Sequence, residues 1–140
     1  MQNYHHFTFE LFIRLFCGII FLFQGYDKLF KVKLNQVIDT FDDEAEKKNI
    51  PKLFVVFSAF YSSIIEFFGG ILLIVGLFKS IVLILLGFDL IMVAFAFSII
   101  EAMWDMKHVF PRLALISALM LMPTEWEIVS IDYLIKLNFK

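Results

Sequence analysis

Three ionisable residues, Arg14, Glu66 and Asp89, each lie within a long stretch of apolar sequence. Carboxylates and a guanidinium in such surroundings can bind a polar ligand group or carry protons. If the stretches lie within a bilayer, each charge costs at least about 2.5–3.5 kcal/mol at the membrane centre, and such residues are by default candidates for a functional site. The alternative is a structural polar contact that fixes helix packing. The sequence favours neither reading over the other.

The apolar stretch around Glu66, residues 53–78, is long enough to cross a membrane. As an α-helix it would extend about 39 Å, which exceeds the roughly 30 Å hydrocarbon core of a bilayer. The whole chain has 140 residues, of which 61% are hydrophobic and 19 are phenylalanine, and a soluble domain of this size cannot bury that much apolar surface. We therefore expect a single integral membrane domain over residues 1–140.

The apolar segments predict an all-α membrane protein, an up-down four-helix bundle. The expected spans are residues 7–30, 53–78, 80–101 and 109–126. Only Lys79 and Ser80 connect the second span to the third, so these two spans should form an antiparallel hairpin. Short interfacial helices are expected in the first loop, where apolar residues recur at helical spacing, and in the C-terminal tail.

The order of the spans predicts that the three charged residues lie at similar depth. If residues 7, 78 and 80 lie at one membrane surface, the helical rise places Arg14, Asp89 and Glu66 about 10, 13 and 18 Å from it. One arginine beside two carboxylates leaves an excess negative charge in a poor solvent. We therefore expect Glu66 or Asp89 to be protonated at neutral pH, or a cation or ligand donor to join them. If Glu66 is neutral, Glu66→Gln should be tolerated.

A second polar layer is expected at the opposite membrane surface. It comprises Gln24, Lys28, His108 and Arg112. For Lys28 and Arg112 the alternative is that their long side chains extend to the lipid headgroups.

Glycines follow helical spacing on the first two spans and predict close helix packing. They are Gly18 and Gly25 on the first span, and Gly69, Gly70 and Gly76 on the second. Small residues let the backbones of membrane helices approach one another, so both faces should point into the bundle.

Several function classes are disfavoured. The histidines lack metal-ligand spacing with acids, so we expect no metal site. The single cysteine, Cys17, cannot form an internal disulfide, and a net charge of −2 gives no basic face for nucleic acid. The absence of a nucleophile–base pair or a phosphate-binding loop in the sequence argues against a stand-alone enzyme.

The sequence resembles the DoxX family of small four-span membrane proteins over nearly its whole length. The first span carries Arg14, Gly18, Phe21, Gly25 and Lys28-Leu29, and residues 66–78 read EFFGGILLIVGLF. Ser130-Ile131-Asp132 is similar to the Ser-Leu-Asp element that closes members of that family. The chain departs from the family pattern at residues 122–126, which replace a glycine-rich lead-in, and in its long lysine-rich loop 31–52.

The resemblance implies a protein of the bacterial cytoplasmic membrane. Some family members are subunits of quinone-reducing sulfur oxidation systems, and others join membrane-associated oxidoreductase assemblies. The first hypothesis is therefore an accessory subunit, with a quinone or lipid-like ligand near Arg14, Glu66 and Asp89. A structural scaffold without a ligand and a small proton-coupled transporter are the alternatives. The expected partners are the lipid bilayer and either other membrane or membrane-associated proteins or further copies of the chain.

Overall fold

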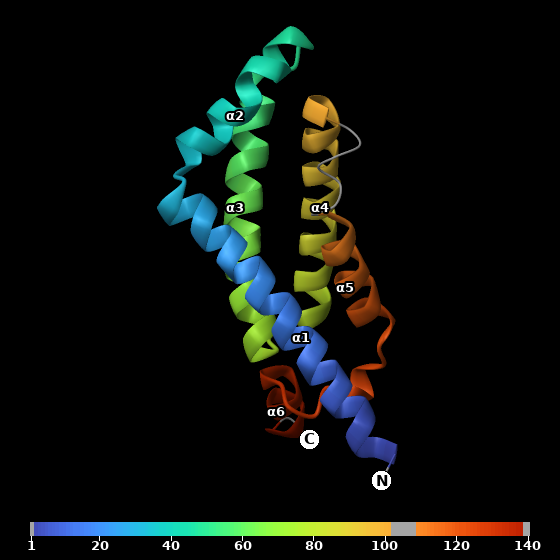
Figure 1. The fold of residues 1–140 in the computed structure, drawn as a ribbon. Helices are drawn as coiled ribbons and strands as arrows, with labels where there is room; N and C mark the ends of the chain where they lie inside the picture. The colour runs from blue at the N-terminus through green and yellow to red at the C-terminus, as the bar shows by residue number, and fades with distance from the viewer. Residues whose placement is uncertain (1, 102–108, 139–140) are drawn as a thin grey trace.

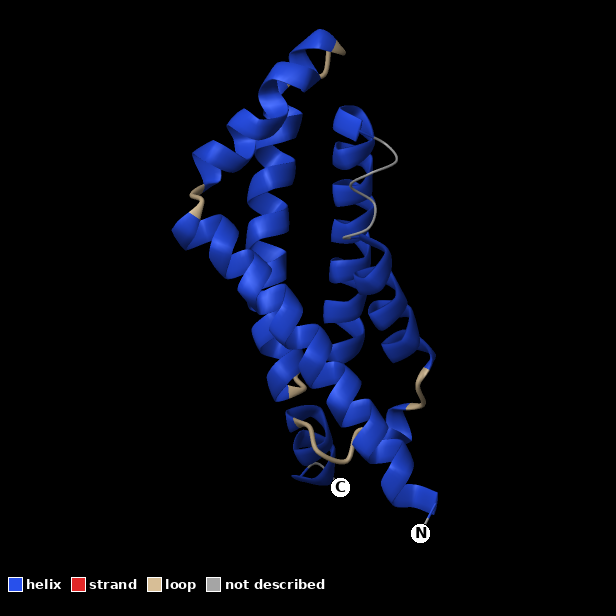
Figure 2. Ribbon diagram, in the orientation of Figure 1, coloured by secondary structure: helices blue, strands red, loops and turns tan. Residues whose placement is uncertain are grey.

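The computed structural model describes residues 2–101 and 109–138, and within these residues it contains helices but no strands (Figure 2). The elements in chain order are α1 (Gln2–Tyr26), the π-helical turn η1 (Asp27–Lys31), α2 (Leu34–Lys47), α3 (Lys52–Val75), α4 (Lys79–Glu101), α5 (Val109–Leu121), the 3-10 turn η3 (Thr124–Trp126) and α6 (Ile131–Asn138). The expected all-α fold, with short additional helices in the first loop and in the tail, is confirmed.

The long helices run alternately up and down (Figure 1). α1 crosses α3 obliquely and makes its most extensive contacts with it, while α4 lies beside α3 and α5 lies beside α4. α2 packs beside the end of α3 at which that helix begins, and α6 lies at the opposite end of the bundle (Figure 1). The bundle therefore carries α2 at one end and α6 at the other.

Three helices in the described residues are long and apolar enough to cross a membrane: His5–Lys31, Lys52–Val75 and Lys79–Ser98. The fourth span, expected over residues 109–126, is a shorter apolar helix of 13 residues. That length gives only about 20 Å of helix. α5 ends at Leu121 because Pro123 disfavours helical backbone at the residue before it.

The glycines of the first span lie where α1 meets α3. A methyl group built at Gly18 would lie 3.0 Å from the carbonyl oxygen of Gly70, and one at Gly25 would lie 2.6 Å from the Cα of Phe67. Side chains at these positions would collide with backbone. The two helices therefore approach as closely as they do only because glycine stands there.

Gly70 belongs to the same contact, since a methyl group there would lie 2.7 Å from the carbonyl oxygen of Gly18. The other two predicted glycines, Gly69 and Gly76, lie in different settings. Gly69 faces Leu86 of α4, where a methyl group would lie 3.2 Å from a leucine methyl carbon. Gly76 ends α3 with a left-handed backbone, φ 69°, that glycine adopts without strain.

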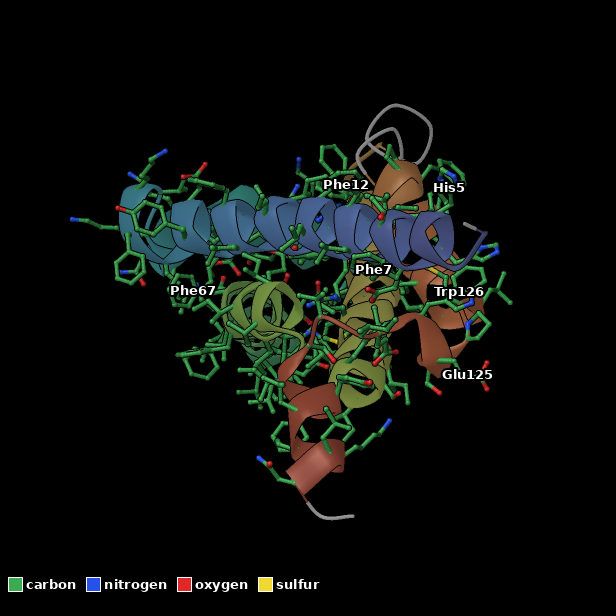
Figure 3. The ribbon with its side chains drawn as sticks, turned by 90° about the horizontal axis from the view of Figure 1, so that it is seen from below. His5, Phe7, Phe12, Phe67, Glu125 and Trp126 are labelled. Atoms are coloured by element: carbon green, nitrogen blue, oxygen red, sulfur yellow. The ribbon has the colours of Figure 1, made fainter. Side chains whose placement is uncertain are left out.

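The main apolar core lies between α1, α3, α4 and α5, and its fully buried members include Phe21, Leu73, Leu86 and Ile116. A smaller cluster joins α2 to α3 through Ile38, Ala45, Val55 and Ala59. Seen from the α6 end of the bundle, Phe12 lies on the side of α1 that faces away from α3 (Figure 3). Phe12 is exposed, as expected for a lipid-facing aromatic side chain.

Candidate functional site

The fully buried carboxylate of Glu66 pairs with two cationic side chains. The Lys28 ammonium lies 2.6 Å from Oε2 of Glu66, and the Arg112 guanidinium donates to Oε1 at 3.0 Å. Arg112 also donates to the side-chain oxygen of Gln24 at 2.6 Å, and Lys28 donates to the hydroxyl of Ser62 at 2.9 Å. Helices α1, α3 and α5 and the turn η1 thus meet at one carboxylate.

Local structure positions each cation. Lys28 lies in the π-helical turn η1, a backbone form that occurs frequently at functional sites and changes the direction of the side chains that follow it. Arg112 lies in the first turns of α5, is almost fully buried and lies over the ring of Phe21 at 6.0 Å. Lys28 keeps about a quarter of its side chain exposed (26%), so it connects Glu66 with the space outside the core.

Asp89 is buried beside this pair without a hydrogen bond of its own. Neither of its carboxylate oxygens has a hydrogen-bond partner among the described residues. Its charged neighbours are Glu66, Lys28 and Arg112, and Ser62 is a polar neighbour. We call Lys28, Glu66, Asp89 and Arg112 the charged centre. When all four are ionised, their charges sum to zero.

The predicted layer of Arg14, Glu66 and Asp89 is divided in the structure. Arg14 lies 3.1 Å from the carboxylate of Glu10. Its guanidinium also donates to backbone carbonyls, to Leu73 at 2.8 Å, to Ile74 at 3.2 Å and to Val129. Arg14 therefore holds the end of α3 and the tail of the chain, and the expectation that it would share one layer with Glu66 and Asp89 was wrong.

The depth calculation failed because residues 7 and 78 do not lie at one level. Gly18 packs against Ile74 and Gly25 against Phe67, so the antiparallel contact places Arg14 beside the last turn of α3. α1 continues past that turn toward its N-terminus (Figure 1). Glu66 lies deeper in the bundle, level with the opposite end of α1.

The second predicted layer is not separate from Glu66. Gln24, Lys28 and Arg112 converge on that carboxylate, while His108 lies outside the described residues. Lys28 and Arg112 pair with Glu66. The alternative, in which their side chains extend to the lipid headgroups, was therefore wrong. The premise of one cation for two carboxylates was therefore wrong, since two cations are present.

A second charged network, which we call the terminal cluster, comprises Glu10, Arg14, Lys79 and Glu127. The Lys79 ammonium lies 3.0 Å from Glu10 and 2.8 Å from Glu127, and all four side chains are buried. Sequence reasoning did not single out Glu10, Lys79 or Glu127 as site residues. The i,i+4 spacing of Glu10 and Arg14 was the signal for their ion pair.

The tail motif around Asp132 fastens the turn between α3 and α4. Asp132 accepts a hydrogen bond from the backbone N–H of Lys79 at 3.1 Å and donates its own N–H to the carbonyl of Gly76 at 3.0 Å. Ser130 accepts the N–H of Tyr133 at 3.1 Å and so caps α6. These contacts give Ser130 and Asp132 a structural role at the end of the bundle.

A cavity of about 120 Å³ lies between α2, α3 and α4, and we call it the α2 cavity. Its lining is apolar apart from Lys28, Ser58 and Ser62, and includes Val37 and Phe41 of α2 and Val93, Ala96 and Phe97 of α4. A cavity of about 150 Å³ holds one benzene ring, so this space suits a single ring or a short length of chain.

Two residues belong to both the cavity and the charged centre. Lys28 and Ser62 line the cavity and bond to each other, and Lys28 also pairs with Glu66. The arrangement can therefore hold the polar head of an apolar ligand and place it beside buried proton-binding groups. Among the described residues, no group of three His, Cys, Asp or Glu side chains is placed to hold a metal ion.

Comparisons with curated proteins and with solved structures each found no match. A family model described as DoxX matches residues 9–99, which include Lys28, Glu66 and Asp89. Arg112 and the Ser130–Asp132 motif lie beyond the matched residues. On that match over most of its length, the chain belongs to the DoxX family.

Proposed function

We propose that this membrane protein is an accessory subunit of a membrane-associated, quinone-linked redox assembly in a bacterial cytoplasmic membrane. The observation that carries the proposal is the position of Lys28. Its ammonium lies both on the wall of an apolar cavity and 2.6 Å from a fully buried carboxylate. A quinone head is a flat apolar ring with carbonyl acceptors, which suits an apolar cavity with a few polar donors.

The charged centre would serve such an assembly by holding the ligand head and exchanging protons with it. Asp89 and Glu66 lie beside one another with Lys28 and Ser62 between them and the cavity. Reduction of a quinone takes up two protons, so buried carboxylates beside a quinone head have a direct use. In such an assembly the electron donor would be another protein.

The test is purification from native membranes through a tag on this chain, followed by an assay of quinone reduction by the purified assembly. We expect an oxidoreductase in stoichiometric amount and a quinone-reduction rate that falls at least tenfold in Lys28→Met. Lys31→Met is the matched control, because Lys31 belongs to the same π-helical turn but is exposed and pairs with Asp27. An assembly without a redox protein, or equal rates in Lys28→Met and Lys31→Met, would contradict the proposal.

A scaffold without a ligand is the second candidate, favoured by the ion pairs that each oxygen of Glu66 makes within the bundle, with Lys28 and with Arg112. On that reading the charged centre only specifies which helices pack together. The same purification separates the two candidates. A scaffold predicts that Lys28→Met loses partner proteins, whereas an accessory subunit with a ligand predicts an intact assembly with slow quinone reduction.

A further inference from the structure

Asp89 is the member of the charged centre whose two carboxylate oxygens both lack hydrogen-bond partners among the described residues. Its side chain is fully buried. Leaving a buried polar group unsatisfied costs about 1–3 kcal/mol, and more for a charged one. Glu66, by contrast, is held by Lys28 and Arg112.

Asp89 does not itself line the α2 cavity but lies close behind its wall. Met92 and Val93, three and four residues further along α4, line the cavity and share a helix face with Asp89. Ser62 of α3, a polar neighbour of Asp89, lines it as well. A second unsatisfied atom is in the cavity wall, because the buried hydroxyl oxygen of Ser58 has no hydrogen-bond partner among the described residues.

The net charge of the charged centre excludes ligands whose head group is itself charged. The four ionised groups of the charged centre sum to zero, and Lys28 is already paired with Glu66. An anionic head would bring a net negative charge into a poor solvent, and a cationic head would bring a positive one. The head that fits is uncharged.

A hydroxyl group matches the unsatisfied atoms. It donates to an ionised carboxylate and accepts from a protonated one, so it satisfies Asp89 in either protonation state. It also accepts from the ammonium of Lys28 at the cavity wall. A carbonyl or an ether oxygen only accepts, and leaves an ionised Asp89 unsatisfied.

We infer that the α2 cavity binds an apolar molecule with an uncharged hydroxyl head, and that Asp89 is the residue that recognises the hydroxyl. This inference rests on the proposed function, since it names the ligand class of the same site. Two sources share this chemistry, a hydroxylated ring such as a hydroquinone and an aliphatic alcohol. In both, the head lies toward Asp89 and the apolar part lies along α2.

Pairs of ligands in which a methyl group replaces the hydroxyl proton test the inference. The dissociation constants of 1-decanol and decyl methyl ether, and of a decyl hydroquinone and its dimethyl ether, are measured on the purified chain in detergent without any partner protein or electron donor. We expect each alcohol to bind at least about tenfold more tightly than its ether in the natural chain. In Asp89→Leu, which lacks an acceptor, this difference should vanish.

A cavity-filling variant tests the location independently. Ala96 lines the cavity, so Ala96→Phe should abolish binding of all four ligands, whereas Ala114→Phe on the exposed face of α5 should leave it unchanged. Equal affinities for alcohol and ether in the natural chain would overturn the inference. It would also be overturned by a preference that persists in Asp89→Leu or by unchanged binding in Ala96→Phe.

The two ligand series also separate this inference from the proposed function. Tighter binding of the hydroquinone supports both. If 1-decanol binds more tightly than its methyl ether but the purified assembly does not reduce quinone, the hydroxyl-binding site is supported and the quinone-linked function is contradicted. If the chain shows no preference for alcohol over ether but still assembles with an active quinone reductase, only the hydroxyl-binding site is contradicted.

Discussion

The ammonium of Lys28 lies 2.6 Å from a carboxylate oxygen of Glu66 that is fully buried, although the two residues lie on different helices and 38 positions apart in the chain. Arg112 completes the pairing from a third helix. Asp89, on a fourth, is equally buried and has no such partner in the described part of the chain. The two carboxylates of the charged centre therefore differ in what their removal should do.

Glu66→Gln should destabilise the bundle strongly, whereas Asp89→Asn should not. Loss of the Glu66 charge leaves two cations near an amide, and breaking a buried ion pair costs about 3–5 kcal/mol. Asp89→Asn removes a charge that no hydrogen bond holds. The check is the free energy of unfolding of each variant in mixed micelles. A Glu66→Gln protein as stable as the natural one would show that Glu66 is normally neutral.

Gly25→Ala should loosen α1 from α3. Its methyl group would overlap the backbone of Phe67, and backbone cannot rotate away as a side chain can. The matched control is Gly87→Ala, because a methyl group there meets nothing within 4 Å. We expect a loss of about 1–3 kcal/mol for Gly25→Ala and a gain of about 0.5–1 kcal/mol for Gly87→Ala. Thermal unfolding in detergent measures both, and equal midpoints would contradict the packing argument.

Arg14→Met should release the tail of the chain. The guanidinium donates to Val129 as well as to the end of α3, and methionine fills similar volume without donors. We expect a broad-specificity protease to cut between residues 122 and 130 at least about tenfold faster than in the natural chain. Lys136→Met, an exposed change in α6, serves as the control. If cleavage is unchanged in Arg14→Met, then the contacts of Asp132 and the ion pair between Lys79 and Glu127 hold the tail without Arg14.

Cys17 should report on the packing of α1. The thiol is fully buried in the main core, so maleimide should react with it at least about a hundredfold more slowly in the folded protein than in denaturing detergent. Gly25→Ala should raise the rate in the folded protein and Gly87→Ala should not. Rapid labelling of the natural chain would place Cys17 outside the core. Mass spectrometry of the labelled protein measures the rate.

The helices could be predicted from the sequence because length and hydropathy decide them locally. Residues 53–78 could form little other than a span. The fourth span was expected to reach residue 126, but α5 ends at Leu121, ahead of Pro123. The choice of Glu66 and Asp89 as buried charges followed from the same local argument. None of these inferences depended on which helix lies next to which.

The partners of the charges could not be predicted in that way, because they depend on how far one helix is displaced along another. The predicted depths assumed that residues 7 and 78 lie at one level, whereas the observed packing of α1 along α3 places Arg14 beside Glu10 and Leu73. The contacts of Gly18 and Gly25 with α3 fix how far α1 is displaced along α3, so these glycines determine which charged residues meet. The π-helical turn that directs Lys28 toward Glu66 has no sequence signature that identifies it.

The bond between Arg14 and Val129 also sets an order of events during synthesis. The two residues are 115 positions apart, so the guanidinium leaves the ribosome long before its acceptor exists. Until the tail arrives, Arg14 and Lys79 lack Val129 and Glu127, and the turn at Gly76 lacks Asp132. Residues 127–132 thus complete contacts of residues that are made much earlier, and a chain truncated after α5 would keep its spans but lose the tail acceptors of Arg14 and Lys79.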